Sequence, residues 1–147
     1  MAIPNVKKGF AKNEETAAFK TLPPMPAEDA GKMCRLIIMK LLPALVERDI
    51  KGFGEALTQI QIVVGNYFAE AQGGTYSSLT ATEGIALMQK LGVYGAGQSS
   101  WGPAFYGLTQ KEKEIELKVK AFLRKSVGGH VFVAKANNRG AYIKVTK

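Results

Sequence analysis

The chain has 147 residues, of which 46% are apolar and 22% are charged. These proportions are typical of one globular domain with a real core, and they exclude a disordered or disulfide-rich chain. The formal net charge is +8, from 20 Lys and Arg against 12 Asp and Glu, which favours anionic partners. The basic residues are spread along the chain without a helix-turn-helix, zinc-finger or RNA-binding signature, so we predict no nucleic-acid partner.

The cellular setting follows from cysteine usage and the absence of long apolar runs. A single cysteine, Cys34, excludes an internal disulfide, and its apolar neighbours predict a buried, unreactive thiol. Lys7 and Lys8 are followed by polar residues, not by the apolar core of a leader peptide. The longest apolar run, residues 36–46, is interrupted by Lys40 and is too short to cross a bilayer. We therefore predict a cytoplasmic protein with no membrane partner.

The first quarter of the chain predicts short, separated elements. Residues 2–10 contain a short apolar piece in which Pro4 predicts an edge strand or the end of a strand. Asn13 is positioned to cap a short helix that continues through Phe19. The proline-rich residues 22–26 predict a stiff, extended linker.

Two long helices are predicted next. Residues 27–48 carry apolar side chains at three-four spacing, with enough extra apolar positions to predict burial on most sides and a kink at Pro43. Residues 51–71 show one clean apolar face. Arg48 and Asp49 join the two segments, which predicts an antiparallel helical hairpin.

The second half of the chain alternates strands with helices. Thr80 or Thr82 is expected to cap the first helix of this half, and Gly92 is expected to end it. The order of elements predicts an α+β fold in which helices cover one face of an antiparallel sheet. The predicted elements are a helix at 81–91, strands at 93–99 and 103–108, a helix at 111–127, a strand at 130–134, a turn at 137–140 and a strand at 141–145.

The most informative stretch is the glycine-rich segment 92–107, which contains five glycines and the only tryptophan. It does not match a standard phosphate loop, because Gln98 stands where a P-loop needs lysine and the dinucleotide fingerprint lacks its third glycine. It also fails as a nucleophile elbow, because Trp101 occupies the position of the last glycine. Two interpretations remain open: a tight turn built for packing, or a loop that faces a ligand.

Several side chains are candidates for ligand contact, each with a structural alternative. Gln98, Ser99 and Ser100 offer donors and acceptors beside glycine amides that can face an anion. Trp101 suits stacking on an aromatic ring, or equally a place in the core. Arg139 suits bidentate contact with phosphate or carboxylate, although Asn and Gly around it are also expected in an ordinary hairpin turn.

The polar loop that follows the predicted helical hairpin is a second candidate for ligand contact, and it would form another wall of the same site. It contains Gln72, Gly73, Gly74 and Tyr76, and its alternative interpretation is loop architecture alone. One histidine and one cysteine cannot build a structural zinc site, so we predict no metal held by protein ligands. A triad of Ser99, His130 and an acid has no support from spacing.

The residues from Gly95 to Gly102 resemble the third motif of the GHMP small-molecule kinase superfamily. The sequence Gly-Gln-Ser-Ser-Trp-Gly-Pro at 97–103 resembles, more closely, the archaeal beta-ribofuranosylaminobenzene 5'-phosphate synthase branch of that superfamily. Residues 41–44, 72–74 and 137–140 carry the same resemblance, which extends over nearly the whole chain. It implies a single domain, 1–147, that corresponds to the C-terminal half of a GHMP enzyme: a ferredoxin-like antiparallel sheet with helices on one face, here with an added helical hairpin. In that family the first strand continues from a preceding domain.

The resemblance also implies an activity. Such synthases join phosphoribosyl pyrophosphate to 4-aminobenzoate or 4-hydroxybenzoate and release carbon dioxide and pyrophosphate, an early step towards methanopterin. The implied partners are a phosphorylated small-molecule substrate and an aromatic acid; magnesium would arrive with the substrate pyrophosphate and no cofactor would be held by the protein alone. No catalytic residue is assigned. The residues expected to bind substrate or phosphate are Gln72, Gly73, Gly74, Gly95, Gly97, Gln98, Ser99, Ser100, Trp101, Gly102, Asn138 and Arg139.

The chain departs from the superfamily in one respect. The N-terminal phosphate loop, a proline followed by Gly-Leu-Gly-Ser-Ser, occurs nowhere in these residues. We therefore expect the isolated chain to lack synthase activity, and we expect an N-terminal-half subunit and a homo-oligomer as partners. Two alternatives stay open: the C-terminal domain of a GHMP-type kinase, which the side chains at 98–101 disfavour, and a free-standing module for ligand binding or dimerisation.

Overall fold

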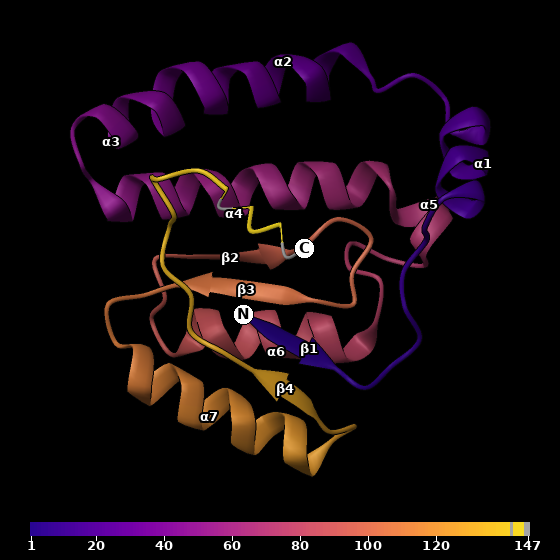
Figure 1. Ribbon diagram of the computed structural model, residues 1–147. Helices are drawn as coiled ribbons and strands as arrows, with labels where there is room; N and C mark the ends of the chain where they lie inside the picture. Colours follow the sequence, from indigo (N-terminus) through magenta and orange to yellow (C-terminus); the bar gives the residue numbers. More distant parts are fainter. Residues whose placement is uncertain (142, 146–147) are drawn as a thin grey trace.

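A four-stranded antiparallel sheet in the order β2-β3-β1-β4 forms the centre of the computed structural model (Figure 1), which describes residues 1–141 and 143–145. The strands are β1 (Ala2–Pro4), β2 (Gly95–Gln98), β3 (Phe105–Leu108) and β4 (Gly129–Val131). The helices are α1 (Asn13–Thr21), α2 (Ala27–Leu36), the π-helix η1 (Ile37–Leu41), α3 (Leu42–Val46), α4 (Ile50–Tyr67), α5 (Ala69–Gln72), α6 (Leu79–Lys90) and α7 (Glu112–Lys125). The predicted α+β class is confirmed.

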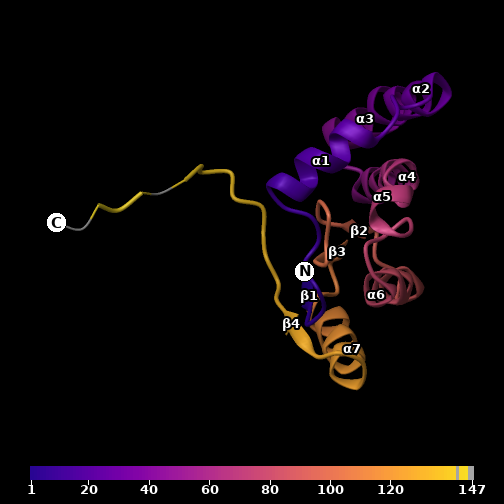
Figure 2. The same cartoon turned by 90° about the vertical axis from the view of Figure 1, so that its right-hand side faces the viewer.

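Helices cover one face of the sheet. Figure 2 shows α4 and α6 on the same side, with no helix among the described residues on the other. The largest fully buried side chains lie between the sheet, α6 and α7 and form one apolar core; they are Phe105, Ile85, Met88, Leu123 and Val119. Within the described residues, no helix combines the length and apolarity that crossing a bilayer requires.

Helix α4 seals the outer edge of β2. The backbone N–H of Ala96 donates to Thr58 Oγ1 at 3.0 Å, and that of Gln98 donates to Gln61 Oε1 at 3.1 Å. An uncovered edge strand would leave these donors available to another chain. The approach is close because both surfaces carry glycine: a Cβ on Gly95 would collide with the backbone of Gly54. Close packing of a helix on a sheet edge therefore explains part of the glycine-rich segment.

The predicted helical hairpin is present, but its first arm differs from expectation. The arm contains a π-helical turn, η1, immediately before α3, whose second residue is Pro43. Asp49 caps α4 by accepting from Lys51 N and Gly52 N, each at 3.1 Å. Burial on most sides was wrong, because the described residues cover only the α4-facing side of this arm. Cys34 is consequently exposed, not buried. The large apolar side chains exposed on this arm are Ile38, Met39, Leu42, Leu45 and Val46.

Helix α6 begins earlier than predicted and ends as predicted. Its cap is Ser78, whose Oγ accepts from Ala81 N at 3.1 Å, so the assignment of Thr80 or Thr82 was wrong. Gly92 follows the helix with a φ of 78°, the left-handed conformation expected of a terminating glycine.

The C-terminal segment departs most from expectation. Strand β4 ends at Val131, and residues 141 and 143–145 form no strand; Tyr142 lies outside the described residues. The turn at 137–140 does form, since Asn137 Oδ1 accepts from Arg139 N at 3.0 Å and Asn137 Nδ2 donates to Gly140 O at 2.7 Å. The segment leads away from the sheet in Figure 2, so the turn has no neighbouring strands to join.

Candidate functional site

The sharp turn between β2 and β3 carries the central residues of the glycine-rich segment. Ser99 N donates to Ala104 O at 2.8 Å, and Gly102 N donates to Ser99 O at 2.9 Å. Ser100 and Gly102 have positive φ values of 51° and 69°, and the Gly102–Pro103 peptide bond is cis. The amides of Ser99 and Gly102 are therefore used within the turn, just as those of Ala96 and Gln98 are used by α4, and none of the four is available to an anion.

The Gln98 side chain ties this turn to the polar loop after α5. Gln98 is only 5% exposed, and its Oε1 accepts from Ser77 N at 2.7 Å. Its Nε2 donates to Gln72 Oε1 at 3.2 Å and to Ser100 O at 2.9 Å. Gln72 Nε2 in turn donates to Thr75 O at 3.0 Å. The two predicted walls of the site are thus joined by a chain of amide hydrogen bonds.

Trp101 is the centre of an aromatic cluster. Its ring centroid lies 4.8 Å from Phe68, 5.1 Å from Phe10 and 6.0 Å from Phe19, and the residue is 6% exposed. The indole Nε1 donates to Glu15 Oε1 at 3.0 Å, which satisfies the one polar group that burial would otherwise leave unpaired. The indole therefore has a structural role, and its edge also borders a cavity.

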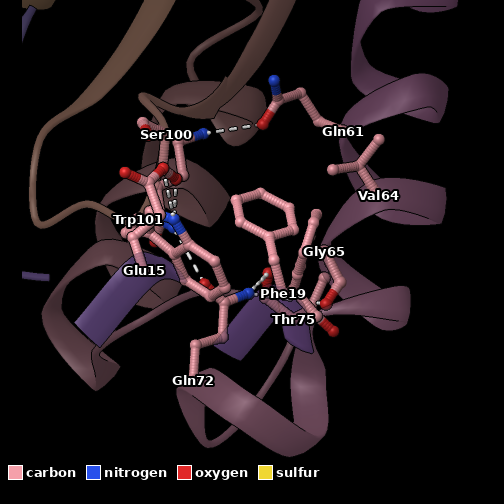
Figure 3. A pocket seen from close by; sticks show the side chains of 11 residues that line it. Glu15, Phe19, Gln61, Val64, Gly65, Gln72, Thr75, Ser100 and Trp101 are labelled. Atoms are coloured by element: carbon pink, nitrogen blue, oxygen red, sulfur yellow. Dashed lines mark hydrogen bonds between the residues drawn. The ribbon is translucent and has the colours of Figure 1, made fainter. Parts of the chain in front are cut away.

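A cavity of about 150 Å³ lies beside Trp101 and is called the Trp101 pocket here. Figure 3 shows the aromatic ring of Phe19 and the indole facing the same space, with amide side chains around it. A cavity of about this volume accommodates a molecule the size of benzene. The lining residues are Glu15, Phe19, Gln61, Val64, Gly65, Phe68, Gln72, Thr75, Gln98, Ser100 and Trp101.

The polarity of the lining limits what the pocket can bind. Glu15 is the only charged residue that lines it, and its carboxylate faces the indole N–H. Apolar rings with a few amide groups suit a flat aromatic molecule whose polar substituents can hydrogen bond. Multiple phosphates would find no lysine or arginine among the residues that line this pocket.

A family profile described as GHMP kinases C terminal matches residues 41–127 of the chain. The chain belongs to the GHMP kinase C-terminal family.

Three archaeal relatives of this GHMP domain share the name beta-ribofuranosylphenol 5'-phosphate synthase. The protein of Archaeoglobus fulgidus is 36% identical over 147 residues, 99% of this chain and 44% of the relative. That of Methanothermobacter thermautotrophicus is 31% identical over 144 residues, 97% of this chain and 42% of the relative. That of Methanocaldococcus jannaschii is 31% identical over 142 residues, 95% of this chain and 40% of the relative. The GHMP domain thus spans less than half the length of each relative.

The structure brings some of the predicted site residues of this GHMP domain together at the pocket. Gln72, Gln98, Ser100 and Trp101 all line it. The other predicted residues of the central segment and the polar loop lie outside the lining: Gly95 and Gly97 buried in β2, exposed Ser99, half-buried Gly102, and Gly73 and Gly74 in the turn after α5.

Asn138 and Arg139 are not brought to the pocket. Both are exposed in the C-terminal segment, which Figure 2 shows leaving the sheet on the side opposite α4 and α6. Nothing in the described residues places the Arg139 guanidinium beside the Trp101 pocket.

Sequence reasoning missed the helical wall of the GHMP domain's pocket. Gln61, Val64 and Phe68 come from α4 and its C-terminal end at three-four spacing, so they share one helix face. That spacing was visible in the sequence, but it was interpreted as core packing. Glu15 and Phe19 come from α1, for which only a short helix was predicted.

Metal binding and acid–base groups are sparse. Among residues 1–141 and 143–145, no group of three or more His, Cys, Asp or Glu side chains is arranged to hold a metal ion. Burial raises the pKa of the Tyr76 phenol, and burial together with the Tyr76 phenol raises the pKa of Tyr106. Both phenols therefore remain protonated at neutral pH and are poor candidates for a general base.

Proposed function

We propose that the chain is the C-terminal domain of a cytoplasmic transferase of the beta-ribofuranosylphenol 5'-phosphate synthase type. The reaction joins phosphoribosyl pyrophosphate to 4-hydroxybenzoate or 4-aminobenzoate, with loss of carbon dioxide and pyrophosphate, in methanopterin biosynthesis. The observation that carries the proposal is the similarity, at 31–36% identity over 95–99% of this chain, to three relatives that bear that name. The word phenol in the name favours 4-hydroxybenzoate as the acceptor.

The Trp101 pocket supports an aromatic ligand. Trp101, Phe19 and Phe68 supply ring faces and edges, and offset or edge-on contacts between aromatic rings are favourable. Gln61 supplies an amide within the same lining, and its Oε1 accepts from Gln98 N, whereas the Nε2 of Gln72 already donates to Gly65 O and Thr75 O. An amide donor such as Gln61 Nε2 can hold a hydroxyl or carboxylate without a formal positive charge, so we assign the ring of the aromatic acid to this pocket.

The phosphates of the second substrate belong elsewhere in this proposal. The pocket lining contains no cationic side chain, whereas a pyrophosphate requires cations, backbone amides or magnesium. We propose that magnesium arrives with the pyrophosphate. We also propose that the phosphates are held mainly by residues outside the pocket, including residues in the part of the relatives that this chain does not cover. Asn138 and Arg139 remain candidates for that contact.

Trp101 provides the test, because it is the only tryptophan and borders the pocket. Titration with 4-hydroxybenzoate should change its fluorescence in a saturable way, while free N-acetyltryptophanamide serves as the control for absorption by the ligand. Val64→Phe would fill the pocket from α4 without adding a second indole, and it should abolish the saturable response. Ile62→Phe, on an exposed part of the same helix, is the matched control and should retain the response. A wild-type response that stays linear, or that Val64→Phe leaves intact, would contradict the assignment.

A GHMP-type kinase domain is the second candidate, favoured by the family description itself. It predicts a saturable response to ATP with magnesium and none to aromatic acids. The same titration therefore distinguishes the two functions.

A further inference from the structure

The Trp101 pocket contains one carboxylate, and one of its two oxygens has no partner in the described residues. Glu15 lies on α1 and lines the pocket. Its Oε1 accepts from the indole Nε1 of Trp101 at 3.0 Å. Within residues 1–141 and 143–145, Glu15 makes no ion pair, and no hydrogen bond reaches its Oε2. Because an ionised carboxylate can accept about four hydrogen bonds, Glu15 can still accept from a ligand.

The surroundings of Glu15 make an unused carboxylate oxygen costly. The residue is half-buried, and the rings of Phe19, Phe68 and Trp101 line the same cavity. Apolar rings give a negative charge little of the stabilisation that water provides, so a hydrogen-bond donor on a ligand would be a favourable replacement for water. An indole N–H needs only a neutral acceptor, which a glutamine side chain would supply. The negative charge at position 15 is therefore more than Trp101 requires.

A free amide donor lies on another wall of the pocket. Gln61 of α4 lines the pocket, and its Oε1 accepts from the backbone N–H of Gln98 at 3.1 Å. That bond fixes the orientation of the Gln61 amide, because an N–H can bond only to the amide oxygen, and it leaves Nε2 without a partner in the described residues. Figure 3 shows Gln61 and Glu15 on different sides of the Phe19 ring. The pocket thus offers an acceptor and a donor to two ends of one ring.

Charge determines which end of an aromatic acid meets each group. Glu15 would repel the carboxylate of the acid, because like charges disfavour each other in a poorly solvated site. The Nε2 of Gln61 can donate to that carboxylate instead. A hydroxyl or amine at the opposite end of the ring can donate to Glu15, whereas an unsubstituted ring cannot. The two groups therefore match a ring that carries a donor para to its carboxylate.

We propose that Glu15 is a specificity-determining residue, which selects aromatic acids that carry a hydrogen-bond donor para to the carboxylate. The donor end of the ring lies at Glu15, and the carboxylate lies towards Gln61. The inference rests on the proposed function and deepens it, because it concerns the aromatic acid assigned to the same pocket. In the proposed reaction the ring loses its carboxylate and keeps its hydroxyl. This orientation therefore holds the end that does not react and presents the other end to the phosphoribosyl donor.

The test compares two dissociation constants of the full chain, measured by isothermal titration calorimetry, as the ratio of benzoate to 4-hydroxybenzoate. The two ligands differ only in the hydroxyl group. The wild-type ratio should be at least about 10, the effect of one hydrogen bond to a charged group. Glu15→Gln keeps an oxygen for the indole of Trp101 but removes the charge, and it should lower the ratio at least about 5-fold. Glu14→Gln, at an exposed position of α1, is the matched control and should leave the ratio unaltered.

The ratio separates specificity from a structural role of Glu15. A loosened pocket would weaken both ligands equally and leave the ratio unchanged, whereas loss of the charged acceptor weakens 4-hydroxybenzoate alone. 4-Aminobenzoate also carries a donor, so it should follow 4-hydroxybenzoate in the wild type and in both variants. Circular dichroism of each variant checks that the chain is folded.

Three results would overturn the inference and leave the proposed function in place. The first is equal affinity of the wild type for benzoate and 4-hydroxybenzoate. The second is a ratio in Glu15→Gln that equals the wild-type ratio. The third is an equal fall of the ratio in Glu14→Gln and Glu15→Gln. Failure of the wild type to bind any of the three aromatic acids would instead remove the basis of both the proposed function and this inference.

Discussion

Gln98 illustrates how one side chain can connect segments that are distant in sequence. Its amide joins Ser77, Gln72 and the carbonyl of Ser100, and it is almost fully buried. A buried amide whose groups are all used is costly to replace, because each former partner is left without a hydrogen bond. A change that destabilises the polar loop should therefore also destabilise the β2–β3 turn, and the reverse should hold.

Gln98→Leu should lower the free energy of unfolding by about 2 kcal/mol, because Ser77 N and the Gln72 amide lose their partner away from water. Urea denaturation followed by circular dichroism measures this change. Gln89→Leu makes the same substitution at an exposed position of α6 and should stay within about 0.5 kcal/mol of wild type. Equal effects of the two substitutions would show that the Gln98 bonds contribute nothing specific.

The raised pKa of Tyr106 predicts alkaline destabilisation. A phenol whose pKa in the folded state lies above its ordinary value of 10.0 stabilises the fold fully below that pH. This contribution is lost as the pH rises from about 10 through the folded-state pKa, because the unfolded chain releases its proton first. Chemical denaturation at pH 8 to 11 should show the decline, and Tyr106→Phe should make it shallower. An unchanged slope would contradict the assignment to Tyr106.

At the residue scale, Trp101, Gln98, Gln72 and Ser100 are the predicted ligand contacts that line the Trp101 pocket, and their role in binding stays a prediction. They were singled out because polar and aromatic residues in a glycine-rich context are distinctive. The sequence could not show which backbone amides of this segment would be available to bind an anion. The N–H groups of Ala96 and Gln98 are used by side chains of α4, nearly forty positions earlier in the chain, and no local pattern records that contact.

At the element scale, the contact of α4 with β2 depends on glycine on both surfaces. Gly54→Ala should lower the free energy of unfolding by about 2 kcal/mol or more, because the added methyl group meets the backbone of Tyr94 and Gly95. Gly31→Ala in α2 is the matched helical control: its Cβ meets nothing, so it should raise stability by about 0.5–1 kcal/mol. Thermal denaturation of both variants measures the contrast, and a shift of the same sign in both would disprove the close-packing argument.

Apolar periodicity predicted the bounds of most helices well. It failed in the arm from α2 to α3, where the helix type changes from α to π. Helices α4, α6 and α7 lie within a few residues of their predicted bounds, since each has a regular apolar face or a recognisable end. The arm from α2 to α3 contains the π-helical turn η1, which inserts one residue and rotates later side chains by about 100°. The apolar stripe that predicted burial is therefore split, and Leu45 and Val46 face outwards.

Strands near the C-terminus were the least predictable. Residues 141–145 alternate apolar and polar side chains, which predicts a strand, but a strand forms only where a neighbour offers its backbone groups. The structure supplies no such neighbour to residues 141 and 143–145. Pairing partners are a property of tertiary structure and are absent from a local sequence window.

At the scale of the whole molecule, the proposed synthase function makes a prediction about the chain on its own. The isolated chain should form no product from phosphoribosyl pyrophosphate and 4-hydroxybenzoate with magnesium, because the Trp101 pocket lacks cationic side chains for the pyrophosphate. Pyrophosphate release measured with the purified chain tests this expectation. Release above the background without protein, and dependent on both substrates, would show that the chain carries a complete active site.

The covered margin of β2 also bears on association between copies of the chain. An exposed edge strand offers its unpaired N–H groups to another strand, and growth of that kind can continue without limit. Side chains of α4 accept from Ala96 N and Gln98 N, so this margin of the sheet gives an incoming strand no template. Fibre growth from β2 should therefore require that α4 first detaches from the sheet.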